Sequence, residues 1–261
     1  MKRDDIIRAL APWGVVALLL ALWQVGALVV RQEYWPGLEE IFPALWQSLR
    51  SGEIWPDLAG SLKRLAIGFA LGLALGVPLG LVAGRSARVE HFVSPLLSMI
   101  YPVPKAALLP LVMLWFGAGD ASKIFVIVMT VSLPLIYHAQ HGAQAVDQKL
   151  LWSARAFGMS RAGEIIRVVL PAALPEILLG MRVAIVLGVI VMLTSEMFVR
   201  QVGLGNLLFT SLDMGQYPAG YSIILVIAFI GFALDFLFER LRRRLTRWAP
   251  RQTQDFEAGA T

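Results

Sequence analysis

The sequence predicts an all-α, polytopic membrane protein with six transmembrane helices. Of its 261 residues, 57% are hydrophobic and only 16% are charged, whereas soluble domains carry about a quarter charged residues. The hydrophobic residues also gather in windows close to the roughly 20 residues that a membrane-spanning helix needs. We therefore expect residues 1–261 to form a single transmembrane domain.

The first predicted span runs from about Trp13 to Val30 and follows the basic residues Lys2, Arg3 and Arg8. It is longer than the roughly 7–15-residue apolar core of a secretory signal peptide. We therefore expect an uncleaved helix that enters the membrane from the cytoplasm.

Residues 31–60 combine acidic side chains with tryptophans, which favour the membrane–water interface. Ile41, Leu45 and Leu49 recur at helical spacing, so part of this stretch is expected to be an amphipathic helix near the outer interface. Residues 1–60 would then form a peripheral first helix and an outer amphipathic segment. For this stretch, the role of a plain connecting segment is as good a reading as a role in receiving a partner.

The second predicted span runs from about Leu65 to Gly84. Glycine recurs every four residues along it, and such a stripe lets another helix approach closely. This pattern indicates helix packing rather than chemistry. The glycines are Gly68, Gly72, Gly76, Gly80 and Gly84.

The third apolar segment, about Phe92 to Phe116, is expected to be kinked or interrupted, because each proline in it removes a helix hydrogen bond. An outer turn should follow, and then a fourth span from about Lys123 to Tyr137. His138 lies at the end of that span and is expected at the membrane interface, as is His141. The prolines are Pro95, Pro102, Pro104 and Pro110, and the turn residues are Gly117, Gly119 and Asp120.

The fifth predicted span covers about Ile177 to Val199, and the sixth about Tyr221 to Phe238. Between them we expect a short helix folded partway into the outer leaflet. The core helices would then occupy residues 61–238, and residues 239–261 would form a basic cytoplasmic tail.

Counting basic residues favours cytoplasmic N- and C-termini, because inner segments of membrane proteins are rich in Lys and Arg. The densest basic run directly follows the last span, which is typical of an anchor at a cytoplasmic membrane face and argues against a nucleic-acid site. The run is Arg240, Arg242, Arg243, Arg244, Arg247 and Arg251.

Several kinds of chemistry have no support in the sequence. The chain contains no cysteine, so it has no disulfide or thiolate metal site, and its three histidines lack metal-site spacing. No GxxxxGK[ST] phosphate loop is present, so ATP hydrolysis by that route would require another subunit.

Two charged residues lie within apolar segments, Lys105 in the third and Glu196 in the fifth. Such residues usually face the interior of the helix bundle or a cavity. One hypothesis places Lys105 on a positive pathway wall suited to anions and Glu196 in an outer gate, with Trp115 and Ser195 as further pathway residues. The alternative is that Lys105 reaches the interface and Glu196 pairs with Arg200.

The stretch from Ala145 to Glu176 is the longest polar-patterned segment between apolar ones, and it predicts two short helices that meet at Gly158. Leu150, Ala154 and Phe157 fall at helical spacing on one face. Ser160 can cap the second helix, with Glu164 in its first turns. We expect Leu170-Pro171 to end that helix. Arg182, farther along, is expected to contact lipid headgroups. An ordinary cytoplasmic loop is the simpler reading.

The spacing in this stretch resembles the cytoplasmic "EAA" loop of permease subunits in binding-protein-dependent ABC importers. That pattern is EAA, three residues, Gly, nine residues, Ile, one residue, Leu-Pro. Ala154, Gly158 and Leu170-Pro171 match it in register. The departures are Trp152 in place of glutamate, Ser153 in place of alanine and Val168 in place of isoleucine.

A second stretch, YPVPKAALLPLVMLWFG from Tyr101 to Gly117, is similar to a signature of the aliphatic-sulfonate, taurine and nitrate branch of these permeases. The resemblance implies a type I importer permease with the MetI-like fold. It also implies a small anionic solute, such as a sulfonate, taurine, nitrate or a related organic acid, moved across the bacterial inner membrane by alternating access.

The same resemblance implies several partners: two copies of an ABC ATPase subunit, a second permease copy as a homodimer, a periplasmic or lipid-anchored solute-binding protein, and membrane lipid. The chain itself would bind no cofactor, since ATP and Mg would be used by the ATPase. It would not be an enzyme. The residues that would couple to the ATPase are Trp152, Ser153, Ala154, Arg155, Phe157, Gly158, Met159 and Ser160.

A rival reading is a secondary transporter or channel driven by an ion gradient, which predicts inverted repeats and acidic relays within the membrane. The sequence has neither, only Glu196. A membrane-bound enzyme is a third reading, but the sequence contains no catalytic motif to support it. A purely structural membrane scaffold would not explain the spacing around Gly158.

Overall fold

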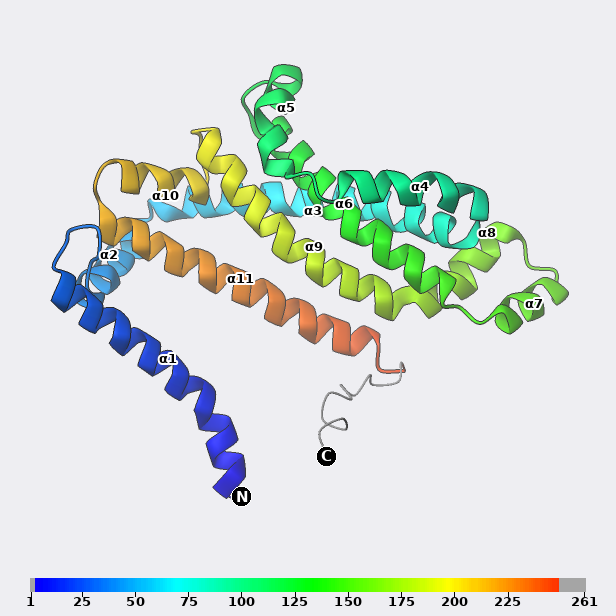
Figure 1. Cartoon of the computed structure of the whole chain (residues 1–261), viewed down its shortest axis with the longest axis horizontal. Helices are drawn as coiled ribbons and strands as arrows, with labels where there is room; N and C mark the ends of the chain where they lie inside the picture. Colours follow the sequence, from blue (N-terminus) through cyan, green and yellow to red (C-terminus); the bar gives the residue numbers. More distant parts are fainter. Residues whose placement is uncertain (1–2, 249–261) are drawn as a thin grey trace. The chain divides into compact units, whose positions relative to one another are not determined.

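The computed structural model describes residues 3–248, with side chains from residue 14 onward, and this part of the chain is helical and contains no strand (Figure 1). Lys2 and Arg251, which enter the topology prediction, lie outside the described residues. The helices are α1 (Arg3–Val30), α2 (Leu38–Ser51), α3 (Ile54–Arg85), α4 (Ala87–Ile100), η1 (Lys105–Leu108), α5 (Leu109–Phe116), α6 (Asp120–Gln144), α7 (Gln148–Ala156), α8 (Arg161–Glu164), η2 (Ile165–Val169), α9 (Leu170–Phe198), α10 (Leu204–Asp213) and α11 (Tyr217–Leu245).

The helices form two compact units. Unit 1 contains the described residues up to Ser61 together with Glu196–Phe229, and unit 2 contains Leu62–Ser195 together with the described residues from Ile230. The long helices α3, α9 and α11 each contribute to both units.

In unit 1, α1 is held through residues in its C-terminal third. The Trp23 indole N–H donates to the carbonyl of Pro36 at 3.1 Å, and the side chain of Gln24 accepts from the backbone N–H of Leu38 at 2.8 Å. The Trp23 ring also meets the edge of Tyr221 at a centroid distance of 5.2 Å. As predicted, residues 31–60 contain an amphipathic helix, α2, on which Ile41 is buried.

In unit 2, the glycine stripe of α3 lies against α6. A Cβ atom added at Gly76 would come within 2.9 Å of Leu135, and one added at Gly80 within 2.7 Å of Ala139. Only a stripe without side chains allows this approach. The predicted packing role of these glycines is therefore confirmed, and it makes α6 a central helix of unit 2.

The third apolar segment is interrupted, as predicted. Helix α4 ends at Ile100, and the chain resumes as η1 and α5 after a bend of 84°. Pro102 and Pro104 occupy the break, where neither can donate a helix hydrogen bond.

Four described helices are long and apolar enough to cross a membrane, and the bent pair of α4 with η1 and α5 makes a fifth candidate. The stretch Gly14–Val30 of α1 is a shorter apolar helix. These stretches correspond in order to the six predicted spans. Helix α6 is longer than predicted at both ends, running from Asp120 to Gln144.

The prediction that Leu170-Pro171 ends a helix is wrong. The helical path continues from Arg161 to Phe198. It changes to π-helical hydrogen bonding over Ile165–Val169 and returns to α-helix at Leu170. Pro171 therefore lies inside a continuous helical path, directly after the π-helical turn, where local changes in helix geometry can accommodate its missing N–H.

Candidate functional site

The segment around Gly158 forms a sharp elbow in unit 2. Helix α7 ends with the N–H of Gly158 donating to the carbonyl of Arg155 at 2.9 Å and that of Met159 to Ala154 at 3.1 Å. Gly158 has φ +76°, a left-handed conformation that disfavours side chains. An added Cβ would meet nothing within 4 Å, so the backbone angle, not space, requires glycine here.

Both helices at the elbow are capped by their own side chains. The Asp147 carboxylate accepts from the backbone N–H of Lys149 at 2.9 Å. The Ser160 hydroxyl accepts from the N–H of Gly163 at 3.2 Å, which confirms the predicted cap. Such caps satisfy N–H groups that a helix end leaves without partners.

The predicted apolar face of α7 is wrong. Leu151 and Ala154 are its buried residues, whereas Leu150 is 53% exposed and Phe157 is 90% exposed. Two adjacent leucines allow two faces by spacing alone, and packing selects the one that meets α6 and α9. Leu151 belongs to a buried cluster with Leu81, Ala139, Ala143, Val146, Val169, Ala173 and Ile177.

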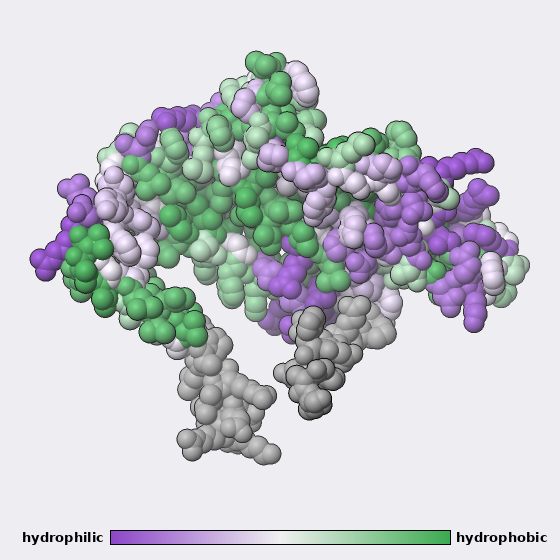
Figure 2. Space-filling view, in the orientation of Figure 1, coloured by the Kyte–Doolittle hydropathy of each residue, from purple (hydrophilic) through white to green (hydrophobic). Residues whose placement is uncertain are grey.

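Three apolar side chains at the elbow are uncovered. Leu150, Trp152 and Phe157 are all more than half exposed. Figure 2 shows polar residues gathered over the α7–α8 end of unit 2, and the same segment carries the exposed charged residues Lys149, Arg155 and Arg161. Exposed apolar groups with a polar rim are typical of a surface that binds another protein.

An ion pair closes the elbow. Arg155 donates to Glu164 through Nε at 2.7 Å and through a terminal nitrogen at 3.0 Å. The Glu164 side chain is 6% exposed, while that of Arg155 is 51% exposed. The hydrogen bond with Glu164 raises the pKa of Arg155 above its ordinary value. Sequence reasoning missed this pair, although opposite charges on either side of a helix-breaking glycine were visible.

Glu196 is fully buried in unit 1 and organises the start of α10. Its carboxylate accepts from the Ser61 hydroxyl at 2.8 Å and from the N–H of Gly205 at 3.0 Å. The Ser61 oxygen in turn accepts from the N–H of Leu204 at 2.9 Å. Arg200 pairs with Asp213 at 3.2 Å instead, so the alternative pairing of Glu196 with Arg200 is wrong.

The other predicted pathway residues have diverse surroundings. The Lys105 ammonium donates to the Tyr101 carbonyl at 2.6 Å and lies 5.5 Å from the centre of the Tyr101 ring. Trp115 is 70% exposed on α5. Ser195 is buried, and its hydroxyl donates to the Met192 carbonyl at 2.7 Å.

Arg182, which was predicted to contact lipid headgroups, has an ion-pair partner within the chain. It donates to both carboxylate oxygens of Asp235, at 2.7 and 2.8 Å, and so links α9 to α11 within unit 2. His138, expected at the interface, lies 2.8 Å from Glu176 through Nδ1. These pairs satisfy charges on otherwise apolar helices.

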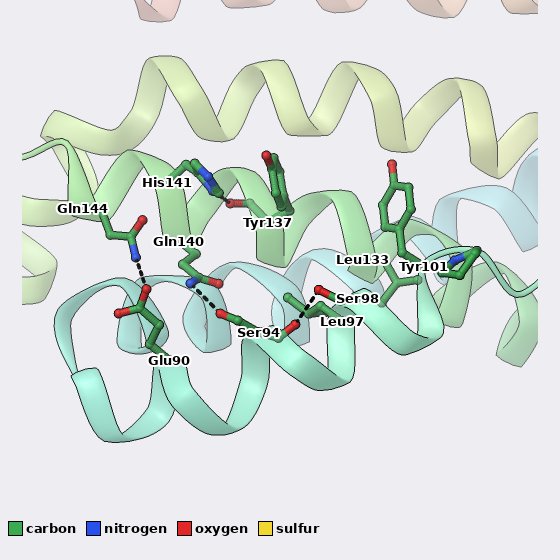
Figure 3. Close-up of a pocket in the computed structure, with 11 residues that line it drawn as sticks. Glu90, Ser94, Leu97, Ser98, Tyr101, Leu133, Tyr137, Gln140, His141 and Gln144 are labelled. Atoms are coloured by element: carbon green, nitrogen blue, oxygen red, sulfur yellow. Dashed lines mark hydrogen bonds between the residues drawn. The ribbon is translucent and has the colours of Figure 1, made fainter.

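A cavity of about 700 Å³ lies along α4 and α6 (Figure 3). Sequence reasoning missed it, and none of the predicted pathway residues lines it. The signal that could have found it is polar residues at helical spacing within two apolar segments. Its lining is Glu90, Ser94, Leu97, Ser98, Tyr101, Pro102, Leu133, Tyr137, Gln140, His141 and Gln144.

Comparison with known proteins gives a consistent result. Residues 76–247 match the family model described as "Binding-protein-dependent transport system inner membrane component". The chain is 34% identical to a protein of Escherichia coli K12 named as an aliphatic sulfonates transport permease, over 92% of each chain. It is 31% identical to the taurine transport system permease protein of the same organism, over 90% of this chain and 88% of the relative.

Among solved structures, the chain resembles one described as an inward-facing conformation of the MetNI methionine ABC transporter. The TM-score is 0.63 at 16% identity, covering 74% of this chain and 98% of that one. At this identity the likeness concerns the fold, and it agrees with the predicted MetI-like arrangement of helices.

Proposed function

Because this chain belongs to the family of binding-protein-dependent transport system inner membrane components, we propose that it moves a small organic anion of the sulfonate class across a bacterial inner membrane. The motion is alternating access, in which the solute binds one state and is released from the other. The sulfonate class is supported by the names of the two relatives and by the Tyr101–Gly117 stretch.

The observation that carries the proposal is the Gly158 elbow. It presents Leu150, Trp152 and Phe157 outward while Leu151 anchors α7 in the buried cluster. A partner ATPase that binds this exposed face would push directly on α6 and α9, the helices beneath it. ATP and Mg would be bound by that ATPase, of which two copies would serve a pair of permeases.

The family pattern places a glutamate where this chain has Trp152. In our proposal the aromatic ring takes that place in the contact with the ATPase, so this contact is apolar rather than charged. The remaining coupling residues are Ser153, Ala154, Arg155, Met159 and Ser160, which shape or cap the elbow.

Within the membrane, we assign Lys105, Trp115, Ser195 and Glu196 to the pathway. The Lys105 ammonium supplies positive charge beside the break between α4 and α5. Glu196 holds the start of α10 and so belongs to an outer gate. Further parts of the proposal are a second copy of this chain, a solute-binding protein on the outer side, and cytoplasmic termini.

The test is uptake of radiolabelled taurine or ethanesulfonate into proteoliposomes that contain the chain, its genomically neighbouring ATPase and its binding protein. We expect uptake only when ATP is present on the side of the membrane that carries the ATPase. An ion gradient alone should give no uptake. Gly158→Pro should abolish both ATPase binding and uptake, because proline cannot adopt the positive φ of the elbow. Gradient-driven uptake by the chain alone would contradict the proposal.

A further inference from the structure

The cavity along α4 and α6 is lined by a polar stripe on each helix. On α4, Glu90, Ser94 and Ser98 recur every four residues, and on α6, Tyr137 and His141 do the same. Figure 3 shows the two stripes turned toward the same space. Polar side chains on apolar membrane helices usually face the bundle interior or a water-filled cavity, so this stripe is a candidate contact surface for a solute.

The lining is ordered by bonds between the two helices. The Gln140 side chain, 5% exposed, donates to the Ser94 hydroxyl oxygen at 3.0 Å. The Gln144 side chain donates to the Glu90 carboxylate at 2.8 Å. A solute therefore meets a Ser94 hydroxyl whose position is already set, which reduces the entropy lost on binding.

Several donors remain available in this cavity. In the described residues, the Ser94 side chain accepts from Gln140 and has no bond in which it donates, and the hydroxyls of Tyr101 and Tyr137 are likewise unused. These are neutral O–H donors suited to an oxyanion. The one carboxylate of the lining, Glu90, accepts from Gln144; it lies one turn of α4 from Ser94 and about three turns from Tyr101, which follows the end of that helix.

The cavity also offers contacts for an organic group. The rings of Tyr137 and His141 lie 4.1 Å apart between centroids, and Leu97 and Leu133 complete the apolar part of the lining. The volume of about 700 Å³ falls in the roughly 300–1,000 Å³ range of small-molecule sites. At the Tyr101 end, the Lys105 ammonium adds a positive charge just beyond the lining.

We propose that this cavity is a transit site for a small organic sulfonate within the permease itself. The sulfonate oxygens accept from the hydroxyls of Ser94, Tyr101 and Tyr137, and the organic part lies against the aromatic rings. No Lys or Arg is in the lining, so the site holds the anion weakly enough for it to leave again, as a conduction path requires. The inference rests on the proposed function for its choice of solute.

The test uses the absence of cysteine in the native chain. In Ser98→Cys the single thiol lies in the cavity, and none of the three proposed donors is changed. The full chain in lipid nanodiscs is treated with a methanethiosulfonate reagent that carries an ethylsulfonate group, and separately with the trimethylammonium reagent of similar size. The matched control is Met99→Cys, the neighbouring residue, which is 71% exposed but absent from the lining.

We expect the ratio of the sulfonate reagent's rate to the cationic reagent's rate to be higher for Ser98→Cys than for Met99→Cys, a comparison that cancels the two reagents' different intrinsic reactivities toward a thiolate. Added ethanesulfonate should slow this reaction about twofold at its dissociation constant and about tenfold at ten times that concentration. Tetramethylammonium should not slow it, and Met99→Cys should show no protection. Ser94→Ala or Tyr137→Phe, each combined with Ser98→Cys, should raise the ethanesulfonate concentration needed for half-maximal protection about fivefold, because each substitution removes one hydrogen bond to the sulfonate.

Three results would overturn the inference: no protection by ethanesulfonate, equal protection of Met99→Cys, or a ratio of sulfonate-reagent to cationic-reagent rates that is no higher for Ser98→Cys than for Met99→Cys. Protection is measured in the absence of the ATPase, so this experiment tests the transit site independently of the proposed function. Sulfonate uptake by the wild-type assembly with an unprotected Ser98→Cys would reject the transit site alone. Absence of ATP-driven uptake by the wild-type assembly would reject the proposed function.

Discussion

Arg155 and Glu164 join the two arms of the elbow by two hydrogen bonds, at 2.7 and 3.0 Å, across the left-handed Gly158. The pair joins two residues nine positions apart, from the last turn of α7 to the end of α8. A backbone that turns through a glycine would otherwise flex at this point. The ion pair therefore restrains the angle between the two arms of the elbow.

Arg155→Gln should weaken coupling between ATP hydrolysis and uptake. Loss of the bidentate pair leaves a buried Glu164 without its partner and lets the elbow bend, so solute moved per ATP should fall by about tenfold, within the range of long-range coupling effects. The measurement is the ratio of uptake to ATPase rate in proteoliposomes.

The matched control for that variant is the charge exchange Arg155→Glu with Glu164→Arg. It should restore part of the lost ratio, since the pair is re-formed with its charges reversed. An unchanged ratio in Arg155→Gln would show that the pair does not contribute to coupling.

Phe157→Ser should weaken binding of the ATPase without destabilising the chain. The ring is 90% exposed, so the folded permease loses little. A central aromatic anchor of an interface contributes about 2 kcal/mol, close to a thirtyfold change in affinity. Binding is measured by titrating labelled ATPase onto nanodiscs that hold the permease.

Leu151→Ala serves as the contrasting variant on the same helix. Leu151 is fully buried, and such truncations cost about 2–5 kcal/mol of stability. It should lower the melting temperature, whereas Phe157→Ser should not. Equal losses of stability would contradict the assigned faces of α7.

Gly80→Ala should separate α3 from α6. The added Cβ would lie 2.7 Å from the Cβ of Ala139, and overpacking of this kind costs about 1–3 kcal/mol. Gly231→Ala on α11 is the control, because nothing lies within 4 Å of its added Cβ. Thermal unfolding in detergent should show a lower melting temperature for Gly80→Ala only.

Glu196→Gln should loosen the start of α10. The neutral amide is a weaker acceptor for the Gly205 N–H and the Ser61 hydroxyl, and hydrogen bonds to charged groups contribute about 1.5–3 kcal/mol. Hydrogen exchange should accelerate about tenfold or more over residues 203–213.

Asp213→Asn is the comparison for that experiment, since the Arg200–Asp213 pair is more than half exposed at both side chains. Exposed pairs contribute about 1 kcal/mol at most, so exchange near α10 should change little. Similar acceleration in both variants would mean that the buried carboxylate has no special role there.

Periodicity along the chain was sufficient to predict features that depend on neighbours in sequence. The glycine stripe of α3, the break after Ile100 and the Ser160 cap were all visible, because each follows from backbone chemistry within a few residues. The continuation of the helix through Leu170-Pro171 was not predicted, because a helix can accommodate a proline where π-helical hydrogen bonding precedes it.

By itself, then, the sequence determined the all-helical class, the order of the apolar segments and the elbow at Gly158. Only the tertiary structure decided which leucine of α7 is buried, that Arg155 closes the elbow onto Glu164, and that polar residues of α4 and α6 line one cavity. The physical reason is that these features depend on contacts between residues far apart in the chain or on different helices. Spacing within one helix fixes which residues share a face, but the partner helix decides which face is covered.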